Sequence, residues 1–178
     1  GTVSAIETDP APSNNSTQAQ TTVLKGCPCS IWSDATIPTV PAVTDGSSIE
    51  VGVKFRANTD GYITGLRFYK GEGNTGIHLG HLWTSTGELL TEITFTGESD
   101  TGWQEAVISP PVAITANTTY VASYHTFTGH FAVNYGYFAT GFDNPPLRAL
   151  ADGEDGPNGV FLYGNDIAFP TSTYNSSN

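Results

Sequence analysis

Apolar and polar residues alternate in short runs along most of this chain. The alternation is clearest in 62–83, where two side chains point to one side of an extended strand and their neighbours point to the other (Leu66 and Phe68; Arg67 and Tyr69). The phase breaks at Gly65, which predicts a β-bulge. Glycines then punctuate a loop too long for a two-residue turn. This stretch therefore predicts strand, loop and strand.

Similar runs recur along the chain, at 51–56, 89–95, 103–108, 119–125, 131–138 and 160–163. Pro110-Pro111 ends the run at 103–108, and the turn at 126–129 predicts a hairpin between the runs on either side of it. No window has a helical period. About eight strands at this spacing predict an all-β fold, an antiparallel β-sandwich that is jelly-roll-like, at 27–178. The polar stretch 1–26 predicts an extended tail.

Composition narrows the class of partner. The chain of 178 residues carries a net charge of −11 with only 6 Lys plus Arg. No basic cluster can neutralise phosphates, so nucleic acid and anionic membrane surfaces are disfavoured as partners. No apolar run is long enough to span a bilayer. Because no signal-peptide pattern opens the chain, we expect a mature or trimmed protein. The acidic charge fits a soluble, outward-facing protein, which we expect to be extracellular or at the cell surface.

Short motifs from 51 to the end of the chain resemble the bacterial domain-of-unknown-function 4082 family. They are 53–56, 65–70, 73–76, 81–83, 102–104, 119–125, 136–138, 158–160 and 169–171. The resemblance implies an extracellular β-sandwich module beside immunoglobulin-like or fibronectin-like neighbours in secreted proteins. It implies no activity and no ligand residues.

Members of this family look as if they continue into a final hydrophobic strand beyond the equivalent of 174–178, whereas this sequence stops there. A sandwich without that strand has an open edge and an exposed groove. The segment 2–8 alternates well enough to be a strand that fills such a groove, in its own chain or in a neighbour (Thr2, Val3, Ala5 and Ile6).

Candidate metal ligands are few. His78 and His81 are three apart in a strand and face opposite sides, whereas His125 and His130 flank a turn and are expected to face each other. Two imidazoles make half a zinc or copper site, and structural hydrogen bonding is the alternative.

A Gly-rich acidic loop suits calcium, although its spacing matches no EF-hand and a solvated turn is the alternative (Asp152, Glu154 and Asp155). No other cofactor is expected.

Cys27 and Cys29 are the two cysteines of the chain. An intramolecular disulfide between them closes a small, strained ring. Pairing with another chain and two free thiols are the alternatives. An extracellular protein favours the oxidised form.

Enzymatic activity finds little support. No Gly-X-Ser-X-Gly motif is present, and the carboxylates lie in loops. Aromatic side chains are the remaining signal, because Tyr and Trp on a sandwich face stack on sugar rings. The surface candidates for ligand binding are Asn74, His81, Tyr135 and Tyr137, although most aromatic residues are expected in the core.

Two hypotheses follow. The chain is either a non-catalytic surface module for adhesion or glycan binding, or a structural subunit of an extracellular filament. In the second case, its N-terminal strand enters a neighbour's incomplete sandwich. The partner is accordingly a polysaccharide or cell-surface glycan, or copies of the chain itself.

Overall fold

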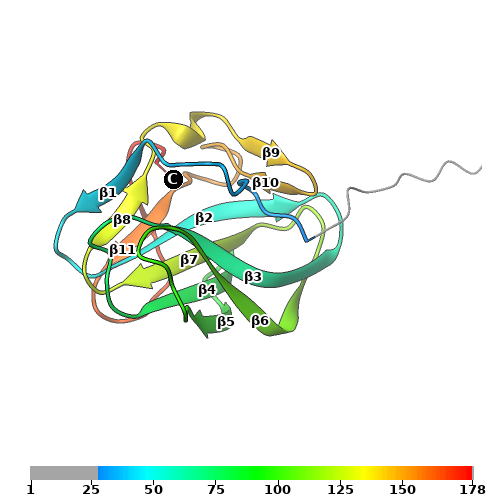
Figure 1. The fold of residues 1–178 in the computed structure, drawn as a ribbon. Coiled ribbons are helices and arrows are strands. Elements are labelled where there is room, and N and C mark those ends of the chain that lie inside the picture. Colours follow the sequence, from blue (N-terminus) through cyan, green and yellow to red (C-terminus); the bar gives the residue numbers. More distant parts are fainter. Residues whose placement is uncertain (1–27, 178) are drawn as a thin grey trace, which may run out of the picture.

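The computed structural model describes residues 28–177, which fold as a two-layer antiparallel β-sandwich without an α-helix (Figure 1). The all-β prediction is confirmed. In chain order the strands are β1 (Val40–Thr44), β2 (Ile49–Ala57), β3 (Gly61–Lys70), β4 (His78–Thr84), β5 (Leu89–Thr94), β6 (Gly102–Ile114), β7 (Tyr120–Thr126), β8 (His130–Val133), β9 (Phe142–Asn144), β10 (Leu147–Ala149), β11 (Val160–Tyr163) and β12 (Ser172–Thr173). The short strands β1, β9, β10 and β12 come in addition to those predicted.

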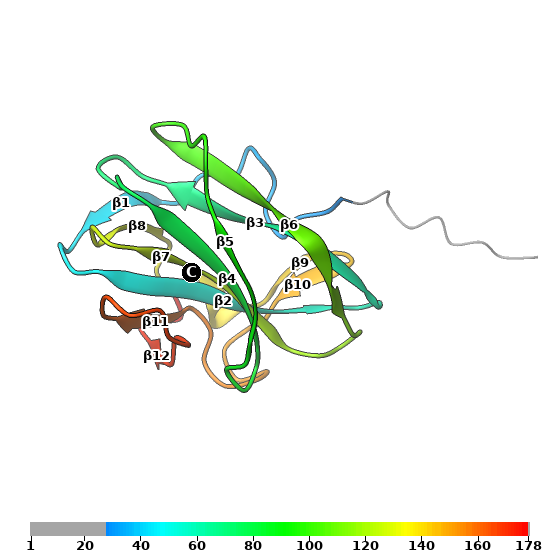
Figure 2. The same ribbon diagram turned by 90° about the horizontal axis from the view of Figure 1, so that it is seen from below.

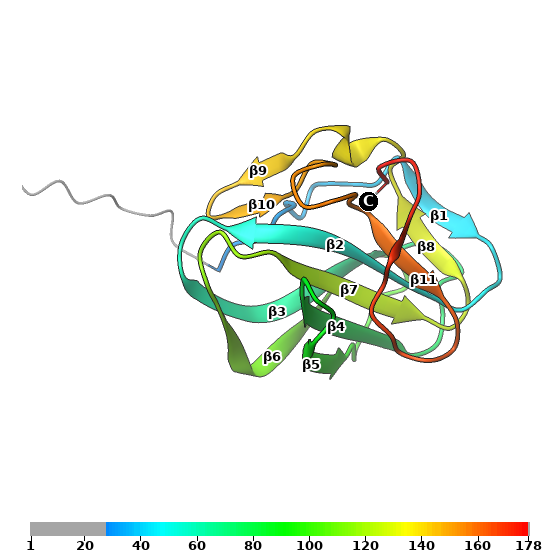
Figure 3. The same ribbon diagram turned by 180° about the vertical axis from the view of Figure 1, so that it is seen from behind.

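The first layer is a continuous sheet in the order β12-β11-β2-β7-β4-β5, with β10 also paired to β2 (Figure 3). Register places Val53 opposite Ala122, and Ala122 opposite Leu82. Because side chains alternate across a strand, this row faces the second layer, and the neighbouring row that contains Ser123 and His81 faces outward.

The second layer consists of two separate ribbons, β3–β6 and β1–β8. Figure 2 views the layers edge-on, with β3 and β6 on one side and β2 and β11 on the other. Strands β1 to β4 alternate between the layers, and so do β5 to β8, as in a jelly roll, whereas β4 and β5 are neighbours in the first layer and β9 to β12 all belong to it.

The core lies between the two layers. Its two clusters are Phe55, Ala57, Leu82, Ile114 and Tyr120, and Leu66, Phe68, Phe95, Ala106 and Ile108. A third cluster, on the outer face of the first layer, joins Trp83, Val121 and Val160, with Ile167 and Phe169 packed against it. The outer row of β4 and β7 is therefore also shielded from water.

Gly65 and the proline pair mark one irregularity. Ile63 pairs with Val112 and Gly65 pairs with Val107, so the predicted bulge at Gly65 is confirmed. The predicted end of the strand at Pro110-Pro111 is wrong, because β6 continues through both prolines to Ile114. The prolines lie where the register is interrupted, so their missing N–H groups remove no ladder hydrogen bond.

The predicted hairpin around 126–129 is also wrong. Strand β7 pairs with β2 and β4 in the first layer, whereas β8 pairs with β1 in the second. The connecting loop changes layers, and Gly129, at a positive φ of 69°, packs against the backbone of Ser47. Strand β8 ends at Val133 rather than at residue 138, because a 3-10 helix begins at Tyr137 after a left-handed Gly136.

Candidate functional site

A cavity of about 530 Å³ lies between the layers beside the core. Its floor includes Val53 of β2 and Tyr124 of β7, and its walls include Phe68 of β3 and residues 131–133 of β8. Inward side chains on the floor remain half-buried, whereas Leu82 in the same inward-facing row is fully buried. The cavity thus lies where packing between the two layers is incomplete. We call it the groove.

The groove runs along the edge of β3 that does not pair with β6. Its lining includes Leu66 and Phe68, which face the core, and also Arg67 and Tyr69, which face the opposite way. A cavity lined from both faces of one strand passes around that strand's edge. Since β3 pairs with β6 alone, its backbone groups on the other edge have no strand partner in the described part of the chain.

Three tyrosines surround the mouth of the groove. Tyr135, Tyr163 and Tyr174 all line it and are 57%, 49% and 60% exposed. The rings of Tyr135 and Tyr174 meet edge to face, with centroids 6.3 Å apart. The Tyr163 hydroxyl donates a hydrogen bond to Asp45, which together with partial burial raises the pKa of Tyr163 to about 12. The mouth combines flat apolar rings with a carboxylate acceptor.

The outer face of β3 and β6 holds a second aromatic group, which fixes residues 30–36. Trp32 stacks on Trp103 at 6.3 Å and donates its Nε1–H to the Tyr137 hydroxyl at 2.8 Å. The guanidinium of Arg67 lies 4.8 Å from the Trp103 ring and donates to Asp34 at 2.5 Å. Tyr137, a predicted ligand residue, is therefore half-buried and already engaged, and its predicted binding role has no support in this geometry.

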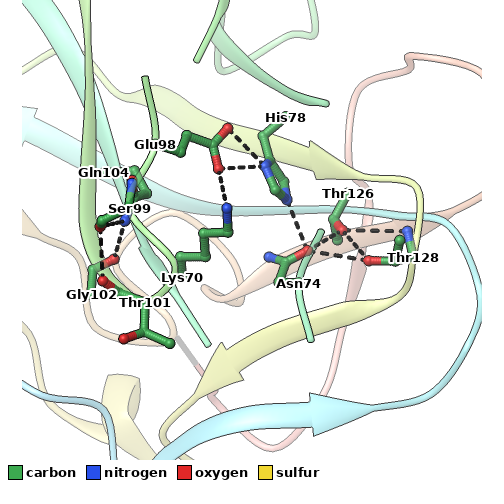
Figure 4. Close-up of polar contacts among 10 residues, drawn as sticks. All are labelled: Lys70, Asn74, His78, Glu98, Ser99, Thr101, Gly102, Gln104, Thr126 and Thr128. Atoms are coloured by element: carbon green, nitrogen blue, oxygen red, sulfur yellow. Dashed lines mark hydrogen bonds and ion pairs between the residues drawn. The ribbon is translucent and has the colours of Figure 1, made fainter. Parts of the chain in front are cut away.

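Asn74 is fully buried, so its predicted surface position is wrong. Its Oδ1 lies 2.8 Å from His78 Nε2 and accepts from the Thr126 hydroxyl at 2.6 Å (Figure 4). On the other side of the imidazole, His78 Nδ1 lies 2.9 Å from Glu98, which also accepts from Lys70 Nζ at 2.8 Å. Burial lowers the pKa of His78, and the opposing effect of Glu98 does not restore it.

His81 is also fully buried, on the opposite face of β4 from His78, and its predicted surface position is wrong. The third cluster covers this face. His81 Nδ1 donates to Glu50 at 2.8 Å, and Nε2 lies 3.2 Å from Glu92. Burial alone would lower the pKa of His81, but both carboxylates outweigh it and the pKa is raised.

Glu50 is the buried ionisable residue that sequence reasoning missed. Burial by itself would raise its pKa, but hydrogen bonds from His125 and His81 hold the pKa below its ordinary value. The available signal was the register: Glu50 pairs directly with His125 across β2 and β7.

Ser48, His125 and Glu50 are connected in the order of a nucleophilic triad. The Ser48 hydroxyl lies 2.8 Å from His125 Nε2, and His125 Nδ1 lies 3.3 Å from Glu50. The groove is lined by neither Ser48 nor His125, and the same carboxylate is shared with His81. We therefore describe these residues as a buried charge network.

The expected convergence of His125 and His130 is wrong, because β7 and β8 belong to different layers. His125 bonds to Ser48, whereas His130 lies 3.1 Å from the Thr128 carbonyl.

The acidic loop does not form the predicted calcium site. Asp155 pairs with Arg56 at 3.3 Å, Glu154 pairs with Arg148, and Asp152 accepts from the backbone N–H of Asn158. The carboxylates thus point to separate donors, and within residues 28–177 no three acidic, His or Cys side chains are grouped to hold a metal.

Two predictions fall wholly or partly outside the described residues. Cys29 is disulfide-bonded, and Cys27 precedes the described part of the chain. The proposed assembly strand precedes it as well (Thr2, Val3, Ala5 and Ile6).

Comparison with known proteins gives a family but no activity. No helix in residues 28–177 is both long and apolar enough to cross a bilayer. No curated protein matches the chain. A family model matches residues 35–178, which is most of the sequence, and the chain therefore belongs to the family of domains of unknown function called DUF4082.

Proposed function

We propose that this domain is a non-catalytic adhesive module on the outside of the cell, and that it binds a polysaccharide chain at the tyrosine-lined mouth of the groove. The observation that carries the proposal is the gathering of Tyr135, Tyr163 and Tyr174 around one opening. Exposed large aromatic rings beside a cavity are typical of binding sites rather than of an inert surface.

The chemistry of the mouth suits a sugar ring. The apolar face of a pyranose packs against a phenol ring, while its hydroxyl groups need acceptors and donors at the rim. The Asp45 carboxylate and the tyrosine hydroxyls provide these groups. The net charge of −11 repels anionic polymers, so we expect a neutral polysaccharide as the ligand.

Affinity electrophoresis in gels that contain neutral polysaccharides tests the proposal. We expect the unmodified chain to be retarded by at least one polymer, and Tyr135→Ala or Tyr174→Ala to weaken binding by about tenfold, the upper range for one aromatic contact. Tyr62→Ala is the matched control, because Tyr62 is 69% exposed but does not line the groove. Equal retardation of all four proteins, or none on any polymer, contradicts the proposal.

A further inference from the structure

The second layer of the sandwich is open where a further strand would fit. Strand β3 lies at the edge of one ribbon and β8 at the edge of the other, and both border the groove. An extended segment in the groove would have the unpaired backbone edge of β3 beside it and the apolar floor of the first layer beneath it. Addition of a strand to an exposed sheet edge is an established mode of peptide recognition.

The lining of the groove matches an alternating apolar segment better than a polar one. The floor side chains are mainly apolar, among them Val51, Val53 and Ala122, together with the ring of Tyr124. Every second residue of a strand points to the same side, so an incoming strand would direct alternate side chains onto this floor. Burial of apolar side chains there removes apolar surface from water and so favours docking.

We propose that the groove accepts residues 2–8 from the N-terminal tail of a second copy of the chain. This stretch reads Thr-Val-Ser-Ala-Ile-Glu-Thr, and its Val3 and Ala5 occupy alternate positions that suit the floor. It carries no Lys or Arg and no proline, so every residue has an N–H group for edge pairing. The proposal goes beyond glycan binding, because it concerns the interior of the groove rather than its mouth.

The length of the tail allows the donor segment to reach a neighbouring copy. Residues 9–27 form a spacer rich in Thr, Ser, Asn and Gln between the donor segment and Pro28. Fully extended, such a spacer reaches roughly 65 Å, whereas a compact domain of this size is roughly 40 Å across. Residues 30–36 are held on the outer face of β3 and β6 by Arg67 and Trp103, which fixes where the spacer joins the domain. The spacer is long enough to cross to another domain.

Cysteine trapping in the full chain tests the proposal. One protein carries Ala5→Cys and a second carries Ala132→Cys in the wall of the groove, and the two are mixed and oxidised gently. The native Cys29 is already disulfide-bonded and does not compete. We expect a covalent heterodimer in at least tenfold excess over a control mixture. In the control, the second cysteine replaces Val107, which is 74% exposed on β6 and lies outside the groove lining.

A chain that carries both Ala5→Cys and Ala132→Cys separates docking within one copy from docking between copies. An intramolecular link at high dilution, with no heterodimer in the mixture, overturns the proposal of a second copy. Absence of both products at a rate above the Val107→Cys control overturns docking of the tail altogether. Because each protein keeps its tyrosines at the mouth, polysaccharide binding can be measured on the same samples and judged independently.

Discussion

Buried polar side chains in this domain form hydrogen bonds to one another in small groups. At the scale of one residue, Asn74 is an example. A lowered pKa keeps His78 neutral at pH 7, so the ring has a single N–H, which the Glu98 carboxylate requires at Nδ1. His78 Nε2 must then accept a hydrogen bond from Asn74. Turning the amide so that its N–H₂ faces His78 also reverses the hydrogen bond with Thr126, whose hydroxyl then accepts. It presents the amide oxygen to the buried Tyr124 hydroxyl, for which no other partner lies within hydrogen-bond distance in the described residues.

The Glu50–His81 pair makes stability depend on pH in a defined window. The lowered pKa of Glu50 contributes stability above pH 4.5, which is lost as the pH falls through the folded-state value. The raised pKa of His81 contributes stability below pH 6.5, which is lost as the pH rises through its folded-state value. Both contributions are complete only between pH 4.5 and 6.5.

We therefore expect Glu50→Gln to lower the free energy of unfolding most strongly near pH 5.5, by about 3 kcal/mol, the scale for breaking a buried pair. The loss should shrink toward pH 9. Urea unfolding of both proteins across this range measures it, with exposed Glu72→Gln as the control. A deficit that is constant from pH 5 to pH 9 would contradict the ion-pair account. His78, whose lowered pKa disfavours the folded state in acid, is common to both proteins and cancels in the difference.

At the scale of the elements, alternation predicted strands well and predicted their partners poorly. The period of two is a local property, so β2, β3 and β7 could be read from the sequence. Pairing depends on the path of the loops, and the loop at Gly129 changes layers instead of closing a hairpin. Short β1 has no such pattern, yet it completes the ribbon that forms one side of the groove.

Gly71 lies in the loop after β3 and packs directly against β1. A Cβ at this position would lie 2.0 Å from the Pro41 carbonyl oxygen and 2.9 Å from the Ala42 side chain. Gly71→Ala must therefore separate the loop from β1, and we expect it to lower the free energy of unfolding by about 2 kcal/mol, as overpacking does. Gly61→Ala, where the added methyl group meets nothing within 4 Å, is the matched control and should change stability by less than about 1 kcal/mol.

Hydrogen exchange then localises the effect of Gly71→Ala. Faster exchange confined to β1 and β8 would fit a ribbon that is loosened from β3. Unchanged stability together with unchanged exchange would show that the loop adjusts without moving β1. That outcome would exclude the contact between Gly71 and β1 as one that stabilises the ribbon.

At the scale of the whole molecule, the core could be predicted from the sequence, whereas the position of the groove could not. The sequence predicted an apolar interior, but the groove arises from the split of the second layer, which no local pattern encodes. The predicted ligand residues illustrate this: Tyr135 lies at the mouth, whereas Asn74 and His81 are buried on opposite faces of the first layer. Tyr163 and Tyr174 were missed as mouth residues because they are far from Tyr135 in the sequence.

Because the groove is unfilled, we expect a larger side chain on its floor to stabilise the isolated chain. Ala122 packs against both core clusters, but it also lines the floor and is half-buried, so the larger side chain of Ala122→Leu has the groove to extend into. The added carbons, at about 0.8 kcal/mol for each buried CH₂ group, should raise the free energy of unfolding by about 2 kcal/mol. For a domain of this length the midpoint of thermal unfolding should rise by about 4–8 °C. The same change should reduce tail docking, because stability and binding compete for one volume.

Ala106→Leu is the matched control for Ala122→Leu. Ala106 is buried in the filled part of the core beside Leu66 and Ile108, so the same enlargement should destabilise the fold by about 1–3 kcal/mol. Calorimetry of the two variants beside the unmodified chain gives opposite signs if the groove is an unfilled site for another segment. If Ala122→Leu is as destabilising as Ala106→Leu, the floor of the groove is already packed and cannot receive a strand.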